Sequence, residues 1–161
     1  MKRHGILNSN ISRVLSAMGH TDRIAIADCG LPVPEGTERI DLAVTFGNPR
    51  FMDVLKAVSN DMKIEAVVLA EEIKEQNPQI LEEIQELFAS FETGFKPEKV
   101  EFVPHTRFKE MTKECRAVIR TGETTPYANI KMCIRDSSGG VSGGLPGKLR
   151  NKPLVRNGRQ N

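Results

Sequence analysis

The sequence predicts an α/β protein built around a mostly parallel sheet. Short apolar segments typical of strands alternate with segments whose apolar residues recur at helical spacing, and the links between them are short. The segment 64–70 is apolar almost throughout, as strands of a parallel sheet are when helices cover both faces. A length of 161 residues suits one domain with a sizeable core.

The first half of the chain is expected to hold two helices and three strands. Apolar residues between positions 11 and 18 follow the i, i+3, i+4, i+7 spacing of a helix. Asn8 or Ser9 can cap the start of this helix, and Gly19 can close its end. The elements that follow in order are strands at 23–27 and 40–44, a helical stripe over 51–58 and the strand at 64–70.

The second half is expected to hold two helices and two strands. The pair Asn77-Pro78 is typical of a helix start, with a capping side chain and a proline at the first helical position. Apolar residues between positions 80 and 91 then line one helical face, opposite a face rich in glutamate. A strand at 100–103, a short helix at 106–113 and a strand at 117–120 follow, and the domain is expected to occupy residues 1–130.

Residues 131–161 differ in composition from the rest of the chain. They hold seven Lys and Arg and one acidic residue, so they carry +6 and residues 1–130 carry −4, although the whole chain has a net charge of +2. They also hold six of the thirteen glycines and no aromatic residue. Such a segment buries too little apolar area to offset the entropy of ordering. We therefore expect a disordered, non-native tail, with a basic arm for nucleic acid or acidic lipid as the alternative.

Composition argues against several classes of protein. No run approaches the roughly 18 apolar residues of a membrane span, and residues 1–9 lack the apolar core of a signal peptide. The three cysteines, Cys29, Cys115 and Cys133, are far apart and form no CxxC pair. This spacing argues against a disulfide scaffold or a structural zinc site and favours a cytoplasmic protein. The chain has no GxGxxG motif and no P-loop, so no nucleotide cofactor is indicated.

Side chains suited to moving protons occur in three loops. His20 follows the first helix, and Asp28 ends the next strand. His105 follows a strand in the second half, and Tyr127 and Asn129 follow the last one. Because sites in open α/β sheets collect in loops beyond the carboxyl ends of strands, these loops are the candidate location for the chemistry.

Each candidate also has an ordinary structural interpretation. Either histidine can be a solvent-exposed loop residue. Asp28 can bond the turn amides that follow it, and Tyr127 can be a packed side chain whose hydroxyl bonds the backbone. Arg120 and Glu123, which begin the last loop, can form a surface ion pair of small energy.

Six short blocks of sequence are distinctive when taken together. They are HGILNS at 4–9, GHTD at 19–22, DCGLPVP at 28–34, AEEIK at 70–74, AVIRTGE at 117–123 and TPYAN at 125–129. In this order, over residues 1 to about 130, they closely resemble the D-ribose pyranase family. The wider superfamily includes the fucose mutarotases, which share the Gly-His and Asp blocks. The runs at 30–34 and 126–129 favour the ribose branch.

The resemblance implies a three-layer α/β/α sandwich that interconverts the β-pyranose and β-furanose forms of D-ribose, or of a related aldose. It implies no cofactor, no metal, and no nucleic-acid or membrane partner. By matching positions, His20 is the expected catalytic acid. The expected sugar-binding positions are Asp28, His105, Tyr127, Ala128 and Asn129. The family also implies a ring-based homodecamer with sites near subunit contacts.

These residue types suit the reaction. Opening a cyclic hemiacetal needs a proton delivered to the ring oxygen and another removed from the anomeric hydroxyl, and a histidine can perform either transfer. A carboxylate such as Asp28 and an amide such as Asn129 can bind sugar hydroxyls. His105 and Tyr127 are both candidates for relaying the second proton. The alternative functions are a fucose-type mutarotase and a non-catalytic sugar-binding module.

The chain departs from the family after Ile130. Family members continue with a short apolar strand, whereas this sequence continues with Lys131-Met132-Cys133 and then the basic, glycine-rich segment. We therefore expect the terminal strand to be missing, and the neighbouring segment 127–129 to lose its support.

Overall fold

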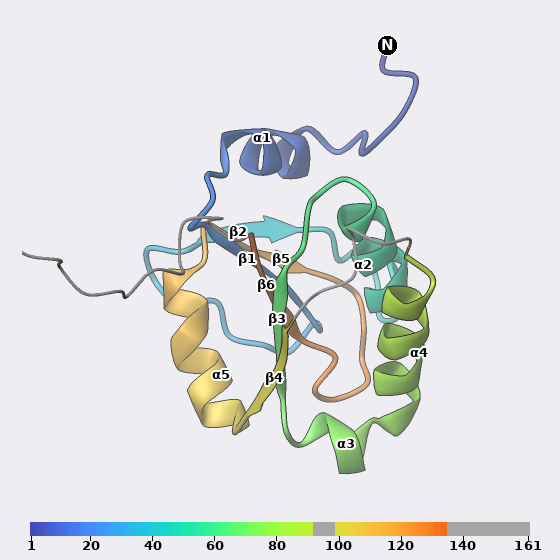
Figure 1. The fold of residues 1–161 in the computed structure, drawn as a ribbon, viewed down its shortest axis with the longest axis vertical. Coiled ribbons are helices and arrows are strands. Elements are labelled where there is room, and N and C mark those ends of the chain that lie inside the picture. The colour runs from blue at the N-terminus through green and yellow to red at the C-terminus, as the bar shows by residue number, and fades with distance from the viewer. Residues whose placement is uncertain (92–98, 135–161) are drawn as a thin grey trace, which may run out of the picture.

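Helices and strands alternate along the chain, as Figure 1 shows for the computed structural model. The structure describes residues 1–91 and 99–134. Its helices are α1 (Ser9–Ala17), α2 (Phe51–Ser59), α3 (Ile73–Gln76), α4 (Pro78–Ala89) and α5 (His105–Met111), with the 3-10 turn η1 (Thr112–Glu114) after α5. Its strands are β1 (Arg23–Ala27), β2 (Glu38–Asp41), β3 (Ala66–Ala70), β4 (Lys99–Val103), β5 (Ala117–Arg120) and β6 (Ile130–Cys133).

The strands form one six-stranded sheet in the order β2-β5-β1-β6-β3-β4. β2, β5 and β1 run parallel to one another, and so do β3 and β4. β6 lies between β1 and β3 and runs antiparallel to both. The other strands therefore all point the same way, and their carboxyl ends meet at one edge of the sheet. The predicted α/β fold with a mostly parallel sheet is confirmed.

Helices cover both faces of the sheet. Successive residues of β1 alternate between two hydrophobic clusters. Ile24 and Ile26 belong to the cluster formed with α2 and α4, whereas Ala25 and Ala27 belong to the cluster that contains Phe108 of α5. Figure 1 shows α2 and α4 on one side of the sheet and α5 on the other. This arrangement confirms the three-layer α/β/α sandwich that the family resemblance implied.

The strand β6 corrects the expectation that the terminal strand is missing. Ile130–Cys133 lies in the middle of the sheet, and Lys131 and Met132 are buried. The backbone of β6 pairs with β1 and β3, and its alternate residues Ile130 and Met132 face the larger core cluster. This alternation is enough to set the register. The sheet thus extends past residue 130, to Cys133. The expectations for the rest of the tail lie outside the described residues.

Several element boundaries also differ from the prediction. β2 covers 38–41 instead of 40–44, because the side chain of Asp41 bonds the N–H of Ala43 and the chain turns away there. The helix α5 begins at His105 with Pro104 as its N-cap, so Thr106 is not the cap. The four-residue α3 is too short for helical periodicity to predict it. Across residues 1–91 and 99–134, no helix is long and apolar enough to cross a membrane.

Candidate active site

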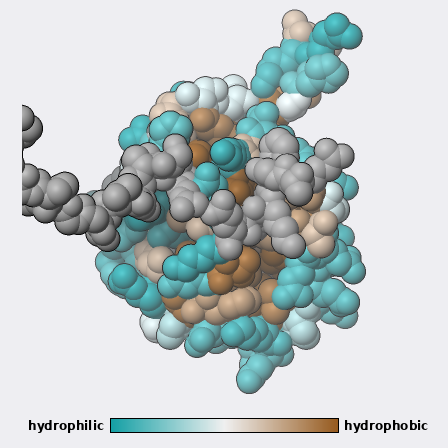
Figure 2. All heavy atoms as spheres, in the orientation of Figure 1, coloured by the Kyte–Doolittle hydropathy of each residue, from teal (hydrophilic) through white to brown (hydrophobic). Residues whose placement is uncertain are grey.

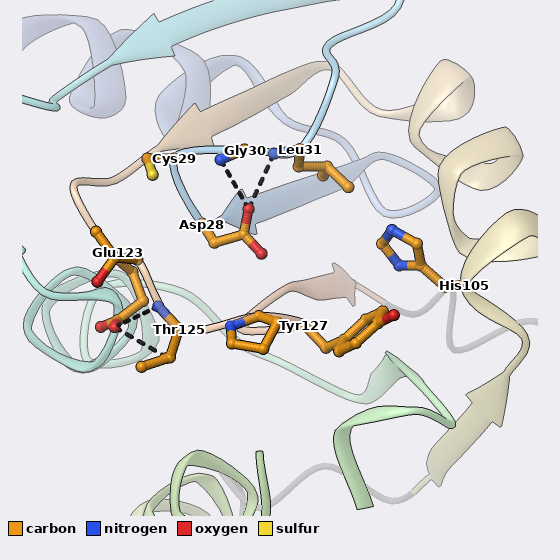
Figure 3. A pocket seen from close by; sticks show the side chains of 10 residues that line it. Asp28, Cys29, Gly30, Leu31, His105, Glu123, Thr125 and Tyr127 are labelled. Carbon is orange, nitrogen blue, oxygen red and sulfur yellow. Dashed lines mark hydrogen bonds between the residues drawn. The ribbon is translucent and has the colours of Figure 1, made fainter. Parts of the chain in front are cut away.

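The carboxyl ends of the parallel strands surround a cavity of about 320 Å³ (Figure 3). Its walls are the turn at 28–31 after β1, His105 after β4 and the loop at 123–127 after β5. These segments are far apart in the sequence and meet because β1, β4 and β5 point the same way. Three of the predicted site residues, Asp28, His105 and Tyr127, therefore share one cavity.

Asp28 is held in place by three N–H donors. Its Oδ1 accepts hydrogen bonds from the backbone N–H groups of Gly30 and Leu31, each at 2.9 Å. Its Oδ2 accepts one from the side-chain amide of Asn129, also at 2.9 Å. The expected turn bonds are thus present, but Figure 3 shows that the carboxylate still faces the cavity. An oxygen of Asp28 with remaining lone-pair capacity can accept a hydrogen bond from a ligand hydroxyl.

Asn129 is placed behind Asp28 instead of at the cavity surface. It is fully buried, and its Oδ1 accepts a hydrogen bond from the Asp28 N–H at 3.0 Å. The neighbouring Ala128 is fully buried as well. Two of the residues expected to bind sugar therefore support the wall of the cavity in this chain, and neither of them lines it.

His105 presents an imidazole to the cavity from the first turn of α5. Its backbone N–H donates to both carboxylate oxygens of Glu72, at 3.1 and 3.0 Å. Its ring packs edge-on against Tyr127, with 5.0 Å between ring centroids, and is nearly parallel to the ring of Phe108. Within the described part of the chain, the buried Nδ1 of His105 has no hydrogen-bond partner. His105 as a whole lines the cavity, although this nitrogen is itself buried.

The surroundings of His105 lower its pKa below the usual value of an imidazole. The main cause is burial, which disfavours the charged form, and the positive charge of Lys109 acts in the same direction. The carboxylates of Glu72 and Asp28 oppose the shift without cancelling it. A neutral imidazole near physiological pH can accept a proton from a substrate hydroxyl.

Tyr127 has a backbone conformation that is unusual for a residue with a side chain. Its φ is 59°, in the left-handed region, which costs such a residue about 1 kcal/mol or more. Its carbonyl accepts a hydrogen bond from the N–H of Asn129 at 2.8 Å. This conformation turns the ring of Tyr127 toward His105. Because the conformation is unfavourable by itself, contacts in the surrounding loop must hold it.

Glu123 is not the surface partner of Arg120. Arg120 pairs with Asp41 at 3.0 Å, whereas Glu123 is only 6% exposed. The Glu123 carboxylate accepts hydrogen bonds from the N–H of Phe51, at the start of α2, and from the N–H and hydroxyl of Thr125. Burial favours a raised pKa for Glu123, but these hydrogen bonds outweigh it and lower the pKa below its usual value.

The structure does not bring His20 to the cavity. His20 is exposed and lies in the turn before β1, whereas Asp28 directly follows the same strand. Five strand residues at roughly 3.3 Å each separate the two ends of β1, so His20 and Asp28 lie at opposite edges of the sheet.

Sequence reasoning did not assign the contacts of two side chains that support the site. Glu72 belongs to the block at 70–74 and lies just beyond the carboxyl end of β3, but nothing in the sequence indicated its bond to the backbone of His105. The contacts of Glu123 had no signal in the sequence. Within residues 1–91 and 99–134, His, Cys, Asp and Glu form no group of three that could hold a metal ion.

The fold and the cavity together define a class: an α/β/α sandwich with a pocket that presents histidine, carboxylate and tyrosine at the carboxyl edge of its sheet. Residues 1–134 match the RbsD / FucU transport protein family, and the chain belongs to this family. It is 55% identical over 130 residues to the D-ribose pyranase of Bacillus cytotoxicus, which covers 81% of this chain and 94% of that protein. It is 54% identical over 130 residues to the D-ribose pyranase of Bacillus cereus, with the same coverage.

Solved structures show the same fold. The structure of Bacillus subtilis RbsD complexed with D-ribose has a TM-score of 0.77 and 43% sequence identity, covering 84% of this chain and 98% of that one. The fucose mutarotase of Streptococcus pneumoniae in complex with L-fucose has a TM-score of 0.66 at 20% identity, covering 84% of this chain and 99% of that one. The second comparison bears on the fold alone.

Proposed function

We propose that this chain is a sugar isomerase that interconverts the β-pyranose and β-furanose forms of D-ribose. The observation that carries the proposal is the convergence of Asp28, His105 and Tyr127 on one cavity. The volume of that cavity, about 320 Å³, lies within the range of small-molecule sites. The names of the relatives and the ribose-bound structure support the same substrate.

The proposed reaction opens the sugar ring and closes it on a different hydroxyl. A base removes the proton of the anomeric hydroxyl while the bond between the anomeric carbon and the ring oxygen breaks, and an acid protonates that oxygen. The product is an open-chain aldehyde. In closure, another sugar hydroxyl attacks the aldehyde carbon and gives up its proton, and the aldehyde oxygen gains one. Protons and electrons therefore balance over the full reaction.

The residues of the cavity suit separate roles in this reaction. His105 serves as the base, because its lowered pKa keeps the imidazole neutral and the residue lines the cavity. Asp28 accepts hydrogen bonds from sugar hydroxyls, and Asn129 positions the Asp28 carboxylate. The ring of Tyr127 packs edge-on against His105 and closes one side of the cavity. The remaining role, the acid that protonates the ring oxygen, falls to His20.

His20 must then act from a second copy of the chain. It lies at the opposite edge of the sheet from Asp28, so a single chain does not complete the site. We propose a homo-oligomer, and by family resemblance a homodecamer, in which His20 of one copy reaches the cavity of the next. Exposed apolar side chains on the chain, among them Val44, Phe46 and Val100, favour contacts between copies. Figure 2 shows apolar residues gathered between α5 and α4, with hydrophilic residues around them.

Two inactive variants test both proposals together. His20→Ala and Asp28→Asn should each abolish the accelerated pyranose–furanose exchange that saturation-transfer NMR measures with D-ribose. When the two variants are expressed together, mixed oligomers contain some sites with both native residues, so part of the exchange should return. Mixed oligomers that form but stay inactive would contradict a shared site.

The same NMR measurement separates the alternative functions. A non-catalytic sugar-binding module would bind D-ribose while exchange ran at the uncatalysed rate, and a fucose-type enzyme would act on L-fucose in preference to D-ribose. We further propose that the protein acts in the cytoplasm, where the reduced state of its cysteines is maintained, and that it has no nucleic-acid or membrane partner.

A further inference from the structure

Asn77 stands at the N-cap position of α4, yet its side chain does not cap that helix. Its side-chain amide nitrogen donates instead to the hydroxyl of Thr125 and to the carbonyl of Pro126, each at 2.9 Å. The residue is only 7% exposed. A buried asparagine at a cap position normally accepts a hydrogen bond from the helix backbone. This one is a donor, and both of its acceptors lie in the loop that forms a wall of the cavity.

The hydroxyl of Thr125 joins Asn77 to a second buried group. It accepts from the amide of Asn77 and donates to the carboxylate of Glu123 at 3.0 Å. Glu123 in turn accepts from the N–H of Phe51 at 3.2 Å. The chain of hydrogen bonds thus runs from the start of α2 to the start of α4 and ties the loop to both helices.

This chain of bonds ends beside the residue with the least favourable backbone. Pro126, whose carbonyl accepts from Asn77, directly precedes Tyr127 with its φ of 59°. Asn77, at the start of α4, binds Pro126, and Phe51, at the start of α2, binds Glu123. The loop is therefore held by both helices. These bonds are among the contacts that offset the cost of the left-handed conformation of Tyr127.

We propose that Asn77 is a positioning residue, which uses its two donor bonds to hold the loop at 125–126 and thereby set the orientation of Tyr127 in the cavity. The role of the loop in binding ribose rests on the proposed function. The orientation of Tyr127 does not, and it can be measured separately.

Replacing Asn77 by Asp is the sharpest test. Aspartate keeps the size of the side chain and is an equally good helix cap, but it removes both donors and places a carboxylate against the Pro126 carbonyl. Asn8→Asp is the matched control, because Asn8 caps α1 by accepting from the N–H of Ile11 at 3.0 Å and aspartate can do the same. Losing bonds of this kind should weaken ribose binding by Asn77→Asp about tenfold, as measured by calorimetry. The ribose affinity of Asn8→Asp should equal that of the native chain.

The fluorescence of the chain reports Tyr127 directly. The sequence holds one tyrosine and no tryptophan, so the tyrosine emission and its anisotropy come from this residue alone. We expect Asn77→Asp to change both signals in the absence of sugar, while Asn8→Asp does not. Weaker binding without any change at Tyr127 would overturn the proposal, and so would unchanged binding and unchanged fluorescence.

Thr125 supplies a second pair of variants in case Asn77→Asp fails to fold. Thr125→Ser keeps the hydroxyl that links Asn77 to Glu123, whereas Thr125→Val removes it at nearly constant size. The valine variant should reproduce the changes in Tyr127 emission and the serine variant should not. If ribose does not bind the native chain at all, the proposed function fails, and the fluorescence comparison still decides the role of Asn77.

Discussion

Asp28 and Asn129 are 101 residues apart in the sequence and are joined by two reciprocal hydrogen bonds. The amide of Asn129 donates to the carboxylate of Asp28, and its oxygen accepts from the backbone N–H of the same residue. This pair fastens the carboxyl end of β1 to the start of β6. It therefore makes the position of the cavity carboxylate depend on the last strand of the sheet.

The Asn129→Asp variant should bind ribose more weakly. It exchanges the donor amide for a second carboxylate beside Asp28 in a buried position, which removes one bond and adds repulsion between like charges. We expect ribose affinity to fall about 10- to 100-fold, the equivalent of a lost bond to a charged group, in a calorimetric titration.

Asn60→Asp is the control for that substitution, since Asn60 is exposed at the end of α2. Its ribose affinity should equal that of the native chain. Native affinity in Asn129→Asp would mean that the carboxylate of Asp28 is held well enough by the turn at 30–31 alone.

The pH dependence of the reaction should follow the charges around His105. If neutral His105 is the base, kcat/KM falls as pH decreases through its pKa, which burial and Lys109 lower. Lys109→Gln removes a cause of the lowering, so the acid limb of the profile should move to higher pH. Glu72→Gln removes an opposing charge, so the limb should move to lower pH while the acceptor for the His105 N–H is kept.

Saturation-transfer NMR between pH 5 and pH 8, the range in which an imidazole near its usual pKa changes charge, measures both profiles. Lys113→Gln serves as the control, because Lys113 pairs with Glu110 at the surface. Shifts of the same sign in Lys109→Gln and Glu72→Gln would assign the acid limb to another group.

The edge of the sheet that holds the site could be predicted from the sequence, because Asp28, His105 and Tyr127 each follow a strand. The hydrogen bonds around them could not. From the sequence alone, an asparagine before a proline indicates a helix cap, and a glutamate in a loop indicates a charged surface residue. Whether Asn77 and Glu123 face solvent or a neighbouring loop depends on how α2 and α4 pack.

Two further features could not be predicted from the sequence, for different reasons. The pattern around His20 suggested a reactive residue but carried no information about whether it lies near Asp28 in the same chain. The segment after Ile130 departs from the family, with a lysine where an apolar residue was expected, and this departure argued against a strand. The strand forms because β1 and β3 would otherwise leave backbone N–H and C=O groups unpaired on their facing edges. A strand between them satisfies these groups on both sides.

Placing β6 in the middle of the sheet buries Lys131, which is unfavourable for the stability of the fold. It is 2% exposed in the central strand, between Ala25 of β1 and Val68 of β3. Its ammonium lies 3.4 Å from Glu114, which also pairs with Arg23. The surroundings are apolar enough that burial raises the pKa of the nearby Cys115 thiol to about 12. A single partner that is half-exposed and shared with Arg23 compensates poorly for removing an ammonium group from water.

Lys131→Met should therefore stabilise the fold. Methionine has a similar length and no charge, and replacing a buried ionic group by an apolar one of like volume gains about 1–4 kcal/mol in favourable cases. Urea unfolding should show a higher midpoint for Lys131→Met, whereas Lys113→Met, which removes an exposed lysine, should leave the midpoint unchanged. A lower midpoint in Lys131→Met would mean that the bond to Glu114 holds β6 in the sheet, and the polarity of this strand would then be a requirement of the fold and not a cost.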